Sequence, residues 1–139
     1  PFEGDGGRHG VSAALEFGVT QLEIGEIIVM GHERCGGIQA ALTGCFHDAP
    51  AGEGGFVERW MSQISDSAAR IAAQRGTGPE AAQVLEEVAI RQSLANLRTF
   101  PFVAEREARG ALKLTGCHFS ISEGQLYMLD EAEDCFRPV

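Results

Sequence analysis

The sequence predicts an α/β fold, with a mostly parallel central sheet flanked by helices and a C-terminal antiparallel hairpin. The first observation is an uninterrupted apolar run at residues 27–30, Ile-Ile-Val-Met, which is typical of a strand buried on both faces of a parallel sheet. The second is the amphipathic helical spacing of apolar residues on either side of this run. The third is a change to alternating apolar residues near the end of the chain, which indicates paired strands.

The first predicted helix covers residues 8–23, where apolar residues recur at spacings of three and four, and Gly25 ends it. The buried strand follows directly. A glycine-rich turn over residues 31–37 then leads into a short helix that begins at Ile38 and ends at Gly44. The order predicted for this part is therefore helix, strand, loop, helix.

Residues 45–55 contain a proline and three glycines, so we expect an exposed loop there rather than a linker between two cores. An amphipathic helix is predicted over residues 56–71, and a longer helix runs from Pro79, which suits a first turn, to about Thr99. Because proline removes a backbone donor, Pro101 must interrupt that helix, and a short helical turn is expected after it.

The end of the chain predicts the hairpin. Apolar residues alternate with polar or small ones over residues 112–121, and Glu123-Gly124 separates them from a second apolar run at residues 126–129. We therefore expect at least one antiparallel edge on the sheet. Residues 1–139 contain no internal repeat, and we predict a single domain.

Composition narrows the classes of partner. The 139 residues carry 11 basic and 20 acidic side chains, and the formal charge of −9 disfavours binding to nucleic acid or to anionic membranes. No apolar run approaches the roughly 20 residues of a membrane-spanning helix, and the first residues do not resemble a secretory signal. We expect a soluble, cytoplasmic protein. The glycine-rich start at Pro1 reads as an interior loop, so we expect the sequence to be a fragment.

The motif that carries chemistry is Gly-His-Glu-Arg-Cys-Gly-Gly at residues 31–37, directly after the predicted buried strand. Ligands in α/β sheets collect at the carboxyl ends of strands. His32 and Cys35 are three residues apart, so an imidazole nitrogen and a thiolate could share one metal ion. This donor pair favours zinc over magnesium or calcium. An isolated pair of this kind predicts a metal poorly, because a buried cysteine is commonly only a small hydrophobe.

The same stretch resembles the β-class carbonic anhydrases, and the resemblance covers nearly the whole chain. Residues 5–17 are similar to the helix that precedes the family's metal strand, and residues 27–37 to its second metal motif. Residues 93–102 resemble the family's long helix and proline turn, and residues 110–116 with the turn after them resemble its terminal hairpin. The blocks occur in the family's order.

The resemblance implies a zinc enzyme that converts carbon dioxide and bicarbonate reversibly, in homodimers or higher homo-oligomers. His32 and Cys35 would be two of its three protein ligands. Gly36 could bring a backbone N–H near the substrate. His32 would also need a hydrogen-bond acceptor to fix its tautomer, which the sequence does not identify.

The family's third ligand is a cysteine in an upstream Cys-x-Asp-x-Arg motif, whose Asp and Arg control access to the metal and orient the nucleophile. We expect that motif to precede Pro1, which leaves no catalytic residue of the family in this chain. Two ligands alone would hold zinc poorly, because catalytic zinc normally has three.

Other candidate residues have ordinary interpretations. Cys45 could in principle replace the missing ligand, but an incidental thiol is favoured. Cys117 and His118 are adjacent on the predicted hairpin and would point to opposite faces, which favours a structural role. Some family members bind bicarbonate at a regulatory site that uses a tyrosine, and the matching position here is Phe119.

Two alternative functions stay open at this point. One is a metal-free paralogue that acts as an oligomeric scaffold or binds bicarbonate. The other is a zinc enzyme that hydrolyses carbon disulfide or carbonyl sulfide. Zinc content and carbon dioxide hydration separate the first from an anhydrase, and competing substrates separate the second.

Overall fold

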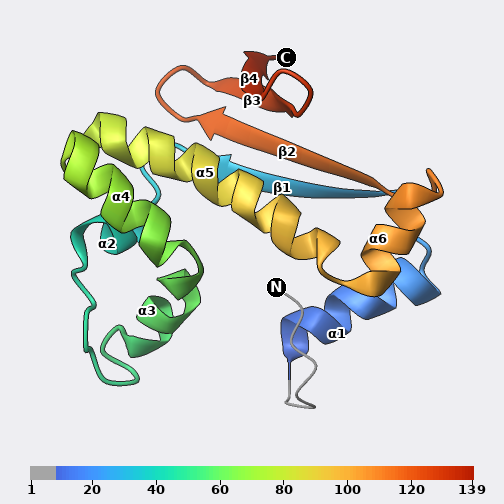
Figure 1. The fold of residues 1–139 in the computed structure, drawn as a ribbon, viewed down its shortest axis with the longest axis horizontal. Helices are drawn as coiled ribbons and strands as arrows, with labels where there is room; N and C mark the ends of the chain where they lie inside the picture. The colour runs from blue at the N-terminus through green and yellow to red at the C-terminus, as the bar shows by residue number, and fades with distance from the viewer. Residues whose placement is uncertain (1–8) are drawn as a thin grey trace. The chain divides into compact units, whose positions relative to one another are not determined.

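The computed structural model describes residues 9–139 (Figure 1). The first eight residues, including the start of the block at residues 5–17, lie outside the described residues. The helices are α1 (Gly10–Glu16), α2 (Gly36–Thr43), α3 (Gly55–Met61), α4 (Ser65–Arg75), α5 (Pro79–Arg98) and α6 (Pro101–Ala108), with a π-helical turn η1 (Phe17–Gln21) and a 3-10 turn η2 (Ser62–Ile64). The strands are β1 (Glu26–His32), β2 (Lys113–Ser120), β3 (Gln125–Asp130) and β4 (Cys135–Pro138).

The four strands form one sheet in the order β1-β2-β3-β4. Strands β1 and β2 run parallel, since the N–H of Lys113 bonds Gly25 O at one end and the N–H of Glu33 bonds Phe119 O at the other, both at 2.9 Å. β2 with β3 and β3 with β4 are antiparallel. The predicted α/β class and hairpin are confirmed, and the sheet is mixed.

Two details of the strands differ from the predictions. The run at residues 27–30 is not buried on both faces: burial alternates along β1, and Ile28 and Met30 are 61% and 66% exposed, because β1 lies at an edge of the sheet. Residues 131–134 form a turn that leads into β4, a strand beyond the predicted hairpin, which carries Cys135.

The chain divides into two compact units. One contains Pro1–Val29 and Arg91–Gly116, and the other contains Met30–Ile90 and Cys117–Val139. β1, α5 and β2 each begin in one unit and end in the other.

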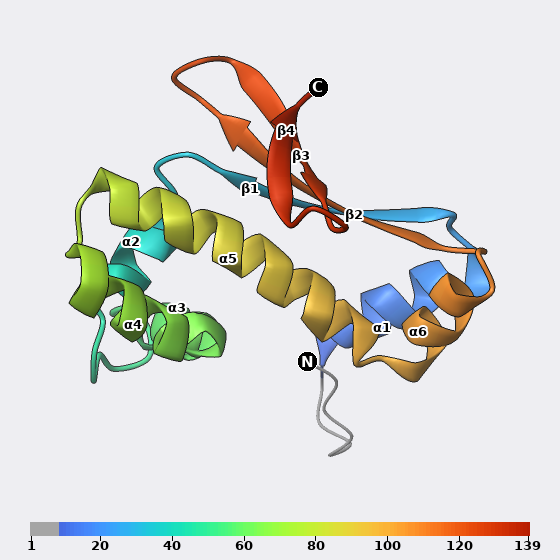
Figure 2. The ribbon, with the colours of Figure 1, turned by 45° about the horizontal axis from the view of Figure 1, so that its top comes forward.

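The larger unit holds a helical core, in which α2, α3 and α4 gather beside the first half of α5 (Figures 1 and 2). Gly44 ends α2 in the left-handed conformation, as the sequence predicts. The helix predicted over residues 56–71 is interrupted by η2, so it forms as α3 and α4. The buried core residues are Ile38, Leu42, Ile64, Ala68, Ile71, Ala81, Ala82 and Leu85.

The smaller unit contains α1, η1, α6 and the second half of α5, and η1 continues α1 and lies beside α6 (Figures 1 and 2). Val19 and Val103 are fully buried there. The backbone of Phe100 is extended, as expected before Pro101, and α6 begins at that proline. None of the helices within residues 9–139 has the length and apolar character that crossing a bilayer requires.

Candidate metal centre

The predicted ligands lie on either side of a tight turn. His32 is the last residue of β1, and Cys35 immediately precedes α2. Between them Arg34 has a φ of 59°, a left-handed conformation that is uncommon for a residue other than glycine. The turn therefore needs contacts on both sides to hold it.

Gly31 allows α5 to approach the strand just before the first ligand. A Cβ added at Gly31 would lie 2.8 Å from Cδ1 and 3.0 Å from Cγ1 of Ile90, which is closer than van der Waals contact permits. The glycine in the motif is thus required by packing against a buried helix residue.

The main chain fixes the ring of His32. Its Nδ1–H donates to the carbonyl oxygen of Glu33 at 2.9 Å, and the ring is exposed. When Nδ1 carries the proton, Nε2 keeps a lone pair, which is the atom a neutral histidine offers to a metal. The Glu33 carbonyl is therefore the acceptor that the sequence did not identify.

The backbone of Cys35 is held at both of its polar groups. Its N–H donates to Oε1 of Glu86 on α5 at 3.2 Å, and its carbonyl accepts the N–H of Gln39 at 3.0 Å. Cys35 is half-buried against the helical core of its unit and is a free thiol.

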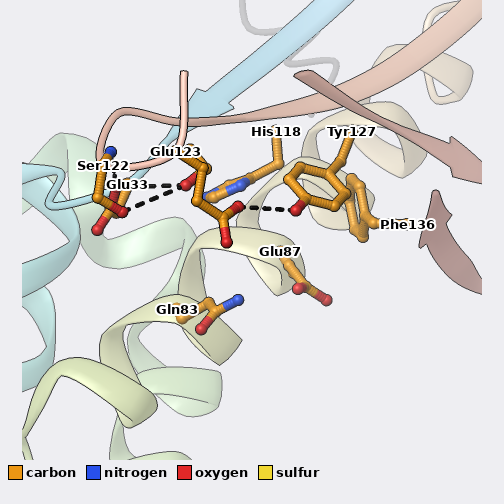
Figure 3. A pocket seen from close by; sticks show the side chains of 9 residues that line it. Glu33, Gln83, Glu87, His118, Ser122, Glu123, Tyr127 and Phe136 are labelled. Carbon is orange, nitrogen blue, oxygen red and sulfur yellow. Dashed lines mark hydrogen bonds between the residues drawn. The ribbon is translucent and has the colours of Figure 1, made fainter. Parts of the chain in front are cut away.

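Glu33 ties the same turn to the β2–β3 turn. Its Oε2 accepts the Ser122 N–H at 2.6 Å and lies 3.5 Å from the Ser120 hydroxyl (Figure 3). The Ser122 backbone N–H is the main reason that the pKa of the Glu33 carboxyl lies below its ordinary value, with a smaller contribution from Arg34.

Behind the turn, Glu86 pairs with His118. His118 Nε2 lies 2.9 Å from Oε2 of Glu86, and the two side chains are only 6% and 2% exposed. Sequence reasoning missed Glu86, although a signal was present. This glutamate interrupts the apolar stripe of α5, four residues after Ala82 and four before Ile90, both of which are buried.

A cavity of about 330 Å³ lies beside this pair (Figure 3). Neither predicted ligand lines it. Tyr127 donates its hydroxyl to Glu123 at 2.7 Å across the cavity wall. The lining residues are Glu33, Gln83, Glu87, His118, Ser120, Ser122, Glu123, Tyr127 and Phe136.

Among the contacts of residues 9–139 described above, none links another cysteine to His32 or Cys35. Cys45 is exposed in the loop after α2. Cys117 is buried, and burial raises the pKa of its thiol.

Within residues 9–139, one group of three side chains has donor atoms close enough for a metal ion: His47, Asp48 and Glu58, all within 4.8 Å of one another. His47 Nδ1 lies 2.9 Å from Asp48 Oδ2, and a carboxylate oxygen of Glu58 accepts the backbone N–H of Asp48. His47 and Asp48 are exposed, so these are contacts of surface side chains.

Comparison with known proteins identifies relatives for this arrangement. The sequence model of the carbonic anhydrase family matches residues 4–126. Beta carbonic anhydrase 6, mitochondrial, of Arabidopsis thaliana is 34% identical over 119 residues, which cover 83% of this chain and 40% of the relative. The chain thus spans less than half the length of this curated relative.

Two solved structures share the fold. The β-carbonic anhydrase CcaA superposes with a TM-score of 0.82 at 26% identity, over 98% of this chain and 66% of the other. A tetrameric β-carbonic anhydrase from Sordaria macrospora superposes with a TM-score of 0.69 at 22% identity, over 92% of this chain and 61% of the other.

Proposed function

This chain belongs to the β-class carbonic anhydrases, and we propose that it contributes two zinc ligands, His32 and Cys35, to the reversible hydration of carbon dioxide. The hydrogen bond from His32 Nδ1–H to the Glu33 carbonyl carries the proposal, because it leaves Nε2 available as a ligand. With the Cys35 sulfur three residues later, the donor set suits zinc.

The residues around the ligands have separate tasks. Zinc held by these residues would supply Lewis-acid chemistry, which lowers the pKa of water to roughly 7 and would make hydroxide available at neutral pH. Gly36 is the first residue of α2, so its N–H lies among the helix-start donors without an intrahelical acceptor and could bind a substrate oxygen. The open space around Gly36 favours this role, because an added Cβ would meet no atom within 4 Å beyond its chain neighbours and its own helix backbone.

The site is incomplete within the 139 residues, because none of their four cysteines begins a Cys-x-Asp-x-Arg motif. We propose that activity needs a third protein ligand and an Asp-Arg pair from outside these residues. Two ligands alone would bind zinc weakly.

We further propose that the protein works as a homo-oligomer in the cytoplasm on carbon dioxide and bicarbonate. The tetrameric state of the Sordaria relative supports the oligomer. On α3 of this chain, Phe56, Val57 and Trp60 are 66%, 40% and 62% exposed, and exposed apolar clusters of this kind commonly form protein contacts. The net charge of −9 supports the absence of nucleic-acid and membrane partners.

Zinc content and stopped-flow carbon dioxide hydration test the function. We expect the chain joined to a Cys-x-Asp-x-Arg segment to bind one zinc per subunit and to hydrate carbon dioxide, and the 139-residue chain to bind zinc weakly and hydrate slowly. A joined protein without zinc and without a rate above buffer would favour the scaffold. The matched control is Cys45→Ser, which should change neither value.

A further inference from the structure

We propose that Glu86 is the residue that positions Cys35 as a metal ligand, and that His118 in turn holds Glu86. This inference rests on the proposed function, in which Cys35 binds the metal. It gives a role to the buried pair of Glu86 and His118, whose presence neither the ligand motif nor the cavity explains. The three residues form one chain of hydrogen bonds from β2, through α5, to the start of α2.

The first step is that both carboxylate oxygens of Glu86 accept hydrogen bonds. Oε1 accepts the Cys35 N–H at 3.2 Å, and Oε2 accepts from His118 Nε2 at 2.9 Å. Glu86 is 3% exposed as a residue. A carboxylate at this depth is costly to bury unless it is hydrogen-bonded, so these two contacts explain why a glutamate is tolerated on the buried stripe of α5.

The second step is that the contact fixes the direction of the Cys35 side chain. Cys35 is extended, with φ −64° and ψ 118°, between the left-handed Arg34 and the first turn of α2. Its carbonyl is held by Gln39 and its N–H by Glu86. With both peptide groups fixed, the Cα–Cβ bond has one direction, and only rotation about χ1 remains for the sulfur.

The third step is that Glu86 is itself braced. His118 is 5% exposed, lies on β2 and packs edge-on against Phe136 of β4, with ring centroids 6.4 Å apart. Both rings also line the cavity (Figure 3). The brace therefore connects the turn to the terminal strands, so that the carboxylate does not depend on α5 alone for its orientation.

Cobalt(II) titration tests the proposal, because cobalt bound by a thiolate gives a near-ultraviolet charge-transfer band that a change in fold alone does not produce. Glu86→Met removes the acceptor at nearly constant size and should weaken cobalt affinity about 10- to 100-fold, the range for residues that orient a metal ligand. Glu86→Gln keeps an oxygen for the Cys35 N–H and should stay within about threefold of the parent. The matched control is Glu87→Met, the next residue of α5, which should leave both band and affinity unchanged.

Glu86→Asp keeps the test decisive should Glu86→Met fail to fold. The shorter carboxylate cannot reach Cys35 and His118 together, so its affinity should fall about tenfold while Glu86→Gln retains binding. The proposal would be overturned if Glu86→Met bound cobalt as tightly as the parent does. If Glu86→Met does not fold, the same result for Glu86→Asp would overturn it. At saturating cobalt, a 139-residue parent protein without the charge-transfer band, or a band that survives Cys35→Ser, would instead refute the ligand assignment, and the positioning role with it.

Discussion

At the scale of single residues, the candidate site is organised by the main chain. His32 bonds the carbonyl of the next residue, and Cys35 presents its N–H to a buried glutamate. Neither contact requires a long flexible side chain at the surface. The ligands are thus oriented by groups whose positions the turn and α5 already determine, which is the condition for a preorganised metal site.

Gly31→Ala tests how closely α5 approaches the ligand strand. The added Cβ would meet Ile90 Cδ1 at 2.8 Å, and overpacking of this kind costs about 1–3 kcal/mol of unfolding free energy. Urea unfolding measures the loss. Ile90→Val should restore part of the stability because it deletes Cδ1, and Gly25→Ala, which meets no atom within 4 Å, is the control. A Gly31→Ala variant as stable as its parent would show that the approach is looser than described.

At the scale of elements, local signals located most of the helices and the hairpin. Pro79 and Pro101 begin α5 and α6, and Gly124 takes the left-handed conformation in the β2–β3 turn. Each of these follows from the residue itself and its immediate neighbours. The break between α3 and α4 was not predicted, because the apolar spacing continues through it. Only tertiary packing determines where the helix is interrupted.

The bidentate pair of Arg98 and Glu107 predicts a pH-dependent contribution of the α5–α6 corner. Arg98 donates to both carboxylate oxygens, at 2.8 and 3.0 Å, and these bonds lower the pKa of Glu107 from 4.5. The stabilisation is therefore complete above that ordinary value and is lost as the pH falls through the lower value in the folded protein. Glu107→Gln should cost about 1 kcal/mol at pH 7 and less at pH 3.

Urea unfolding at the two pH values measures this difference. The control is Glu105→Gln, whose ion pair with Arg109 is 68% and 69% exposed and should change stability by less than about 0.5 kcal/mol. If Glu107→Gln lost the same unfolding free energy at both pH values, the charge of Glu107 would not be the source of the stabilisation.

At the scale of the whole molecule, some features depend on contacts between distant segments, and the sequence did not predict these features. The apolar run in β1 matches an inner strand, yet the described chain places it at a sheet edge with Ile28 and Met30 exposed. The pairing of Glu86 with His118 joins α5 to β2, two segments far apart in the sequence, for which no local pattern exists. The ligand pair was visible because its residues are neighbours. The single domain over residues 1–139 stays a prediction.

Trp60→Lys tests the proposed oligomer. A charge in the exposed apolar cluster of α3 should lower the mass measured by sedimentation and leave the helical circular dichroism unchanged. Ile121→Lys places the same charge at another exposed apolar residue, 53% exposed in the β2–β3 turn, and should leave the mass unaltered. A mass that does not respond to Trp60→Lys would exclude α3 from the subunit contact.

X-ray absorption at the zinc edge tests the central claim, that His32 and Cys35 bind one metal ion together. We expect one sulfur at about 2.3 Å and one imidazole nitrogen at about 2.0 Å in the zinc-loaded 139-residue chain. Cys35→Ser should remove the sulfur shell, and His32→Ala the imidazole scattering. A zinc spectrum with oxygen neighbours only, or one that neither substitution alters, would contradict the account.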